Sequence, residues 1–296
     1  MGYSAADVRD ILLDTWNYVQ CTTTGDDSDP SRADVFALNS YSWCGDSSYT
    51  TSGYDVLVSD FSNTSVPVFF SEYGCNVPAP RVFTEVPVLY GPLMTPVLSG
   101  GMVYEFSQET SNYGLVTIND DGSAQLLSDY NTLQDQFNTL NITSIQGVKA
   151  QNTTTVAPAC DSSLITSSTF ANNWTIPAVP PGAEDLINNG IKNANNGKII
   201  SVSSTKVTQK VTDVGGNTIS DLAIKPLAND ASNTPSGETT GSNATSSSTT
   251  SSSPSSTATG TSSAASSTST KKSSARKIEG SMIALVAVLG VGLVLI

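Results

Sequence analysis

The stretch "VPVFFSEYGCN", residues 66–76, decides the fold. Its run of apolar, β-favouring residues closes at Gly74 and Asn76, which predicts a strand buried on both faces. Strands of this kind occur in parallel sheets, and in a (β/α)8 barrel their carboxyl-terminal ends form the active-site face. A single carboxylate, Glu72, follows the apolar run. We therefore treat Glu72 as a candidate catalytic residue.

Strand and helix patterns alternate on both sides of this stretch. Residues 5–20 place apolar side chains at helical spacing, with Asp7 in the expected first turn. The segment "DVFALNSYSW" (34–43) predicts a strand, "GGMVYEF" (100–106) predicts another, and residues 123–140 predict an amphipathic helix. Such alternation is typical of a parallel α/β fold with right-handed crossovers.

The predicted α/β region is too short for a complete barrel. Only about three and a half strand and helix units fit before residue 160, whereas a (β/α)8 barrel takes roughly 250 residues. We therefore predict that residues 1–160 form the C-terminal half of such a barrel. Residues 206–224 predict a hairpin around Gly215 and Gly216, so residues 161–230 are expected to form a small β-rich appendage.

The end of the chain has a different composition. Residues 231–274 are almost entirely small and polar and cannot bury enough apolar surface to fold, which predicts a disordered Ser/Thr-rich stalk. The final residues are apolar up to Ile296 and somewhat shorter than the ~20 residues that span a bilayer. Small residues, a short polar spacer and an apolar terminus predict a glycosylphosphatidylinositol (GPI) attachment signal at 275–296. A tail-anchored helix is the alternative.

Charge and composition argue against several classes of function. The net charge of −13 disfavours nucleic-acid binding and anchoring by a basic patch. The chain contains no histidine, which removes Ser-His-Asp catalysis, Cys-His catalysis and His-ligated metal sites. We expect no metal and no cofactor, so carboxylates and phenols remain as the chemical groups.

Two further features predict passage through the secretory route. Four cysteines lack metal-type spacing and allow three disulfide pairings. Five Asn-x-Ser/Thr acceptors for glycosylation occur at Asn63, Asn141, Asn152, Asn173 and Asn243. Residues 1–10 contain no apolar signal-peptide core. Because a GPI signal acts only on a chain that has entered the endoplasmic reticulum, we expect this chain to be missing its natural beginning.

Five motifs occur together in one order. They are "GYSAADV" (2–8), "YSWCGDSSYTTSGY" (41–54), "PVFFSEYGCN" (67–76), "FTEV" (83–86) and "NYGLV" (112–116). Over residues 2–160 the chain resembles the fungal cell-wall β-1,3-glucanosyltransferases of glycoside hydrolase family 72. The resemblance implies a (β/α)8 barrel, a retaining double displacement on β-1,3-glucan, and Glu72 as the nucleophile after strand 7.

The resemblance also implies the surroundings of Glu72. Tyr41, Tyr104 and Tyr113 match positions that line the sugar subsites, and Asp7 matches a residue that helps to hold the substrate. Aromatic rings stack on the apolar faces of glucose, and a phenol that donates to a carboxylate favours its charged form. A role in the core remains open for each tyrosine, and a role at the helix start for Asp7. The implied disulfides are Cys44 with Cys75 and, by remainder, Cys21 with Cys160.

The partner of the nucleophile is not evident in this sequence. A retaining mechanism needs two carboxyl groups about 5 to 5.5 Å apart, one ionised and one protonated. The family takes its acid/base from an Asn-Glu pair, and this chain contains no Asn-Glu dipeptide. Glu105 and Glu109 are the other acidic residues near the implied site. We therefore expect the isolated chain to be nearly inert.

The function predicted from the sequence is elongation of β-1,3-glucan by a cell-surface enzyme. Its partners would be donor and acceptor glucan chains and, through the GPI anchor, the membrane; it could be held in the plasma membrane, the cell wall or both. A non-catalytic, GPI-anchored glucan-binding or structural wall protein is the alternative. A mucin-like spacer without a folded N-terminal region is a third possibility, although that region is rich in apolar residues.

Overall fold

The described residues of the computed structural model fall into two compact units, Met1–Ile224 and Lys225–Ile296. The structure describes residues 1–148, 155–171, 173–175, 178–198, 200–201, 203–225, 232–233 and 239–240. In the second unit, β8 (Ser232–Asn233) and β9 (Thr239–Thr240) pair antiparallel. The rest of the predicted stalk and all of the predicted anchor signal lie outside the described residues. None of the helices described is long and apolar enough to cross a bilayer.

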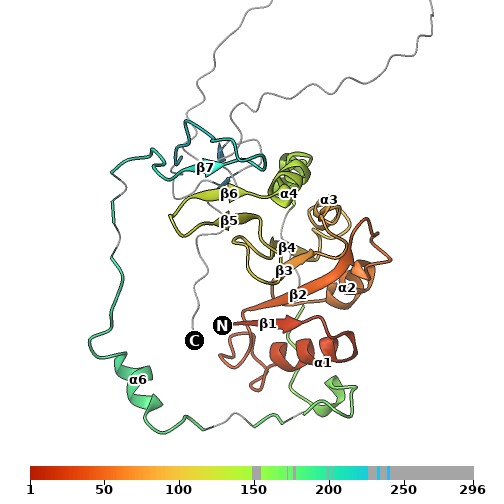
Figure 1. Cartoon of the computed structure of the whole chain (residues 1–296). Coiled ribbons are helices and arrows are strands. Elements are labelled where there is room, and N and C mark those ends of the chain that lie inside the picture. Colours follow the sequence, from red (N-terminus) through yellow and green to blue (C-terminus); the bar gives the residue numbers. More distant parts are fainter. Residues whose placement is uncertain are drawn as a thin grey trace, which may run out of the picture. The chain divides into compact units, whose positions relative to one another are not determined.

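A four-stranded parallel sheet forms the centre of the first unit (Figure 1). Its order follows the sequence, and every neighbouring pair is parallel. The strands are β1 (Gly2–Ala6), β2 (Val35–Cys44), β3 (Val68–Cys75) and β4 (Leu98–Val103). The predicted α/β class and the strands predicted within 34–43 and 66–76 are confirmed, while the half-barrel remains a prediction.

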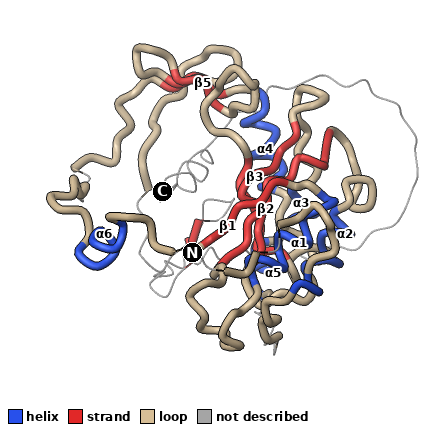
Figure 2. Tube along the Cα trace, turned by 90° about the horizontal axis from the view of Figure 1, so that it is seen from below, coloured by secondary structure: helices blue, strands red, loops and turns tan. Residues whose placement is uncertain are grey.

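Helices cover one side of this sheet. Figure 2 shows the first three helices gathered on one side of the strands: α1 (Arg9–Gln20), α2 (Tyr54–Phe61) and α3 (Val86–Leu89). Trp16 of α1 and Phe61 of α2 contact the buried Phe36 of β2, with ring centroids 5.0 and 5.6 Å away. Each large apolar side chain buried in this core stabilises the fold by roughly 1.5–3 kcal/mol.

Two predicted helices begin later than their sequence patterns indicate. Within 5–20, Ala5 and Ala6 belong to β1 and α1 begins at Arg9, so Asp7 lies before the helix. Within 123–140, a strand precedes α4 (Ser128–Asn138). In both places the residues pair with another strand instead of continuing the helix. Apolar residues in such short segments fit both periods, and tertiary pairing decides between them.

A second, smaller sheet pairs two strands from before residue 127 with one strand of residues 161–230, whose β-rich appendage remains a prediction. It consists of β5 (Val116–Ile118), β6 (Ala124–Leu126) and β7 (Val211–Thr212), in that order. The predicted hairpin is present as antiparallel bridges between Thr212 and Thr218 and between Lys206 and Ala223. Because a lone hairpin is marginal in water, its pairing with β6 supplies the support that it needs.

The segment that follows residue 155 runs along α1. The Asp14 carboxylate accepts hydrogen bonds from the backbone N–H groups of Thr166 and Ser167, both at 2.8 Å. Other links between this segment and the α1 region are Asn17 with Leu164, Tyr18 with Trp174, and the disulfide of Cys21 with Cys160. The remaining helical elements are α5 (Ile142–Gly147), a 3-10 turn (Ser162–Leu164) and α6 (Ala183–Asn189).

Candidate active site

Glu72 lies near the carboxyl-terminal end of β3 and is hydrogen-bonded to a phenol. Tyr41 of β2 donates from its Oη to Glu72 Oε2 at 2.5 Å. Burial and this hydrogen bond to Glu72 raise the pKa of Tyr41 well above its usual range. Tyr41 therefore stays protonated and acts as a donor at neutral pH. Both side chains are only partly buried, so a substrate could reach them.

Three tyrosines gather beside this hydrogen bond. The rings of Tyr41, Tyr104 and Tyr113 meet edge to face, with centroids 5.4 to 6.3 Å apart. We call these three residues the tyrosine cluster. Tyr104 directly follows β4, and Tyr113 lies on the loop between β4 and β5. A hydrogen bond to Glu105 and the charge of that residue raise the pKa of Tyr104. The structure thus brings together four of the residues predicted for the site.

Asp7 lies near the same edge of the sheet but has other partners. It accepts a hydrogen bond from Ser40 Oγ at 2.9 Å and forms an ion pair with Arg9. Arg9 also donates to the backbone carbonyl of Gly53 at 3.1 Å. Successive side chains of a strand point to opposite faces, and Ser40 is adjacent to Tyr41. The structure therefore does not join Asp7 to the tyrosine cluster through any contact among the described residues.

A group of small polar residues was missed by the sequence reasoning. Ser71 Oγ donates to Asn39 Oδ1 at 2.6 Å, and the hydroxyls of Ser4 and Ser71 lie 2.7 Å apart. Asn39 precedes Tyr41 by two residues and therefore shares its face of the sheet. Polar residues inside the otherwise apolar strands were the available signal. They give the sheet a polar face next to Glu72.

Both disulfides have the pairing that the resemblance implied. Cys44 and Cys75 connect the ends of β2 and β3 just beyond Tyr41 and Glu72. Cys21 and Cys160 connect the end of α1 to the segment that packs along it. The first disulfide therefore holds together the two strands that carry the hydrogen-bonded pair.

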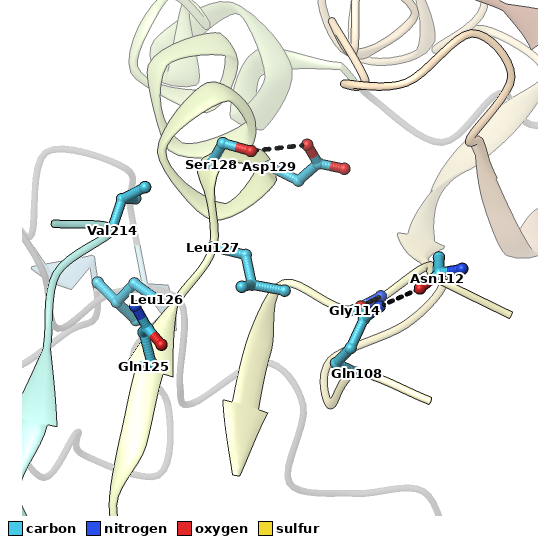
Figure 3. Close-up of a pocket in the computed structure, with 9 residues that line it drawn as sticks. All are labelled: Gln108, Asn112, Gly114, Gln125, Leu126, Leu127, Ser128, Asp129 and Val214. Carbon is cyan, nitrogen blue, oxygen red and sulfur yellow. Dashed lines mark hydrogen bonds between the residues drawn. The ribbon is translucent and has the colours of Figure 1, made fainter. Parts of the chain in front are cut away.

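A separate pocket of about 280 Å³ lies next to the loop that carries Tyr113 (Figure 3). It contains none of the predicted site residues, and we place the candidate site at Glu72 because the phenol and carboxylate meet there. Its lining residues are Gln108, Asn112, Gly114, Gln125, Leu126, Leu127, Ser128, Asp129 and Val214. Within the described part of the chain, no group of acidic or cysteine side chains is placed to hold a metal ion.

A family model described as glucanosyltransferase, of glycoside hydrolase family 72, matches residues 1–141. This region belongs to the glucanosyltransferase family. The match includes Glu72 and all three members of the tyrosine cluster. The family membership expected from the sequence motifs is thereby confirmed.

Related glucanosyltransferases share much of this sequence. The chain is 49% identical over 242 residues to 1,3-beta-glucanosyltransferase gel2 of Aspergillus fumigatus, an alignment that covers 82% of this chain and 50% of that protein. It is 41% identical over 210 residues to the probable 1,3-beta-glucanosyltransferase GAS3 of Saccharomyces cerevisiae, covering 68% and 40%. The chain thus spans half or less of the length of these relatives.

A solved glucanosyltransferase structure supports the α/β fold. The crystal structure of ScGas2, from Saccharomyces cerevisiae, in complex with a compound aligns with a TM-score of 0.51 and 32% sequence identity. The alignment covers 63% of this chain and 40% of the ScGas2 chain.

Proposed function

We propose that this chain carries the nucleophile of a β-1,3-glucan glucanosyltransferase, and that Glu72 is that nucleophile. The observation that carries the proposal is the hydrogen bond from Tyr41 to Glu72 at the carboxyl-terminal edge of the parallel sheet. Tyr41 holds Oε2, while Glu72 Oε1 accepts no hydrogen bond from any described residue. The second oxygen is thus available to attack a sugar, and the names of the relatives support glucan transfer as the reaction.

The reaction would proceed by two displacements. Glu72 Oε1 attacks the anomeric carbon of a β-1,3-glucan, the bond to the leaving glucan oxygen breaks, and an acid supplies that oxygen with a proton. A hydroxyl of an acceptor chain then attacks the glycosyl ester and gives up its proton to the same group, now a base. The carboxylate of Glu72 is released, and the new bond retains the β configuration.

The tyrosine cluster would favour attack on the glycosyl ester by an acceptor chain over attack by water. Its rings offer apolar faces on which glucose units can stack, and its hydroxyls can bind sugar oxygens. An acceptor chain held in this way competes with water for the glycosyl ester. The cluster would therefore favour transfer over hydrolysis.

The partner acid/base and the rest of a barrel belong to the same proposal. We infer that the four parallel strands and their helices form half of a (β/α)8 barrel. The family's Asn-Glu pair has no counterpart in this sequence, and no described carboxylate contacts Glu72. The isolated chain should therefore react poorly with natural glucans, whose leaving oxygen needs a proton.

The test uses a donor whose leaving group does not need protonation by an acid. A fluorinated dinitrophenyl β-glucoside loses its phenolate without protonation, and its glycosyl ester breaks down slowly. We expect mass spectrometry of the whole chain to show one added sugar, on the peptide that contains Glu72. Glu72→Gln should abolish the labelling, whereas Glu109→Gln, the matched change at an exposed carboxylate on the loop after β4, should leave it unchanged. A label on another side chain, or none, would disprove the role of Glu72.

The same variants test the alternative of a glucan-binding protein. The tyrosine cluster could bind glucan without turnover, and the absence of a carboxylate in contact with Glu72 among the described residues favours this reading. That function predicts retention on insoluble β-1,3-glucan with no labelling, and equal retention of Glu72→Gln.

We also propose that the protein is secreted and anchored at the cell surface. Its two disulfides are typical of an oxidising compartment, and the acceptors Asn63, Asn141 and Asn173 are exposed. Asn152, Asn243 and the predicted anchor signal lie outside the described residues. Phosphatidylinositol-specific phospholipase C should release the protein from membranes, and its retention after treatment would count against a GPI anchor in the membrane.

A further inference from the structure

Arg81 lies between β3 and α3 and is almost completely buried, with 2% of its surface exposed. Its guanidinium makes four hydrogen bonds. Nη1 donates to the backbone carbonyls of Tyr104 at 2.7 Å and Gly74 at 3.4 Å, and Nη2 donates to that of Tyr113 at 2.5 Å. Nε donates to the carboxylate of Asp129 at 2.7 Å. One side chain thus holds three separate pieces of backbone.

These pieces of backbone carry the candidate site. Gly74 follows Glu72 by two residues on β3, and the other two carbonyls belong to members of the tyrosine cluster. Arg81 also lies against the ring of Tyr113, with Cζ 5.8 Å from the ring centroid. The guanidinium therefore connects the strand of the proposed nucleophile to the tyrosines that would bind sugar.

The ion pair with Asp129 holds the guanidinium through Nε. Asp129 lies in the first turn of α4, and Figure 3 shows it across the pocket from Gln108 and Asn112 of the loop that carries Tyr113. A buried charge is stable only when it is paired and hydrogen-bonded. The position of α4 is thereby coupled to the position of that loop.

The geometry needs arginine in particular. A guanidinium has five N–H donors in a rigid plane, whereas the ammonium of lysine is a compact charge with three donors and no fixed fork. Lysine at position 81 could keep the charge next to Asp129 but could not reach all three carbonyls together.

We propose that Arg81 is a positioning residue that fixes the tyrosine cluster relative to Glu72, and thereby sets the ratio of glucan transfer to hydrolysis. The part that concerns the ratio rests on the proposed function. The part that concerns backbone position does not, and the two parts are tested by different measurements.

The first measurement is amide hydrogen exchange in the whole chain. In Arg81→Lys we expect exchange to rise about ten-fold or more within residues 104–116, because the loop loses its buried anchor. The matched control is Arg32→Lys. Arg32 is also buried, and it donates to the carbonyls of Gln20 and Asp27 and to Ser65 Oγ, before β2 and β3 begin. Equal exchange in residues 104–116 of the two variants would overturn the proposal.

A second variant covers the case in which Arg81→Lys does not fold. Asp129→Asn keeps an oxygen acceptor for Nε but removes the charge. It should raise exchange in the same loop by a smaller factor and leave the strands β1 and β2 unchanged. An effect spread evenly over the sheet would show a general stabilising role and contradict positioning.

The second measurement compares two products of one reaction. The chain is given an activated β-glucosyl donor with a β-1,3-gluco-oligosaccharide as acceptor, and transferred and hydrolysed sugar are counted. A smaller folded fraction lowers both products equally, so only repositioning changes their ratio. We expect Arg81→Lys to lower the ratio about ten-fold and Arg32→Lys to preserve it. An unchanged ratio in an active Arg81→Lys would refute the role in transfer. If the unmodified chain forms neither product and the fluorinated donor does not label Glu72, the proposed function fails, and the exchange measurement still decides whether Arg81 positions the loop.

Discussion

The hydrogen bond between Tyr41 and Glu72 depends on one irregularity in the pairing of β2 with β3. Leu38 pairs with Phe70, but the next pair is Asn39 with Glu72, so Ser71 is an additional residue on β3. A bulge of this kind re-aims the side chains that follow it. With regular pairing, Ser71 would take the place opposite Asn39, and Glu72 would point to the helix-covered face.

Removing the phenol oxygen should slow the proposed attack. In Tyr41→Phe, Glu72 loses the donor that fixes Oε2, and hydrogen bonds to charged groups contribute about 1.5–3 kcal/mol. We expect labelling by the activated fluorinated donor to slow about ten-fold or more. Tyr104→Phe removes a hydroxyl from the same cluster that has no hydrogen bond to Glu72 and should slow labelling much less. Equal effects of the two variants would contradict a special role for Tyr41.

Glu85 makes stability depend on pH. It is 3% exposed, and burial raises its pKa from 4.5 to about 7, although its own backbone N–H and the charge of Arg81 oppose the shift. Because the folded-state pKa is above the unfolded value, its contribution to stability is fully present below pH 4.5 and is lost as the pH rises through about 7. The loss amounts to about 3 kcal/mol.

Replacing Glu85 should remove this dependence. Urea unfolding of Glu85→Gln is expected to show a smaller loss of unfolding free energy between pH 4.5 and 7 than the parent chain. Glu109→Gln, at an exposed position, should keep the parental slope. Identical slopes for Glu85→Gln and the parent would mean that Glu85 is not buried as a protonated acid.

At the scale of secondary-structure elements, α1 is held on two sides. Its apolar residues pack on the sheet, and Asp14 binds the backbone of the segment that runs along it. Burial alone would raise the pKa of Asp14, but the hydrogen bonds from Thr166 and Ser167 together lower it. This stabilisation is therefore present at neutral pH and is lost as the pH falls through the lowered folded-state pKa.

Replacing the Asp14 carboxylate should detach the segment around Thr166 and Ser167 from α1. Asp14→Asn replaces one acceptor oxygen with an N–H donor that faces backbone N–H groups, and we expect a loss of roughly 2–3 kcal/mol in unfolding free energy. Limited proteolysis should then cut faster between residues 161 and 175, and both cysteines of the disulfide between Cys21 and Cys160 stay in the N-terminal fragment. Asp10→Asn, at an exposed position of the same helix, should leave the cleavage rate unchanged. Unchanged cleavage in Asp14→Asn would show that other contacts hold the segment.

At the scale of the whole molecule, the sequence predicted what local patterns can encode. The parallel strands and the position of Glu72 follow from apolar runs and their ends, and the family motifs indicated the tyrosines and the disulfides. The starts of α1 and α4 could not be predicted, because pairing with distant strands decides them. Arg81 escaped notice for a related reason: its partners Tyr104, Tyr113 and Asp129 lie 23, 32 and 48 positions away. Such convergence leaves no local pattern.

The disulfide between Cys21 and Cys160 has a consequence for biosynthesis. The two cysteines are 139 positions apart, and ribosomes add about 5–20 residues per second. Cys160 is therefore translated about 7 to 30 seconds after Cys21. During that interval the nascent chain already offers Cys21 the thiols of Cys44 and then Cys75. A disulfide from Cys21 to either thiol would prevent the disulfide between Cys44 and Cys75 that joins β2 to β3. Correct maturation should therefore require an isomerase that rearranges early mispaired disulfides.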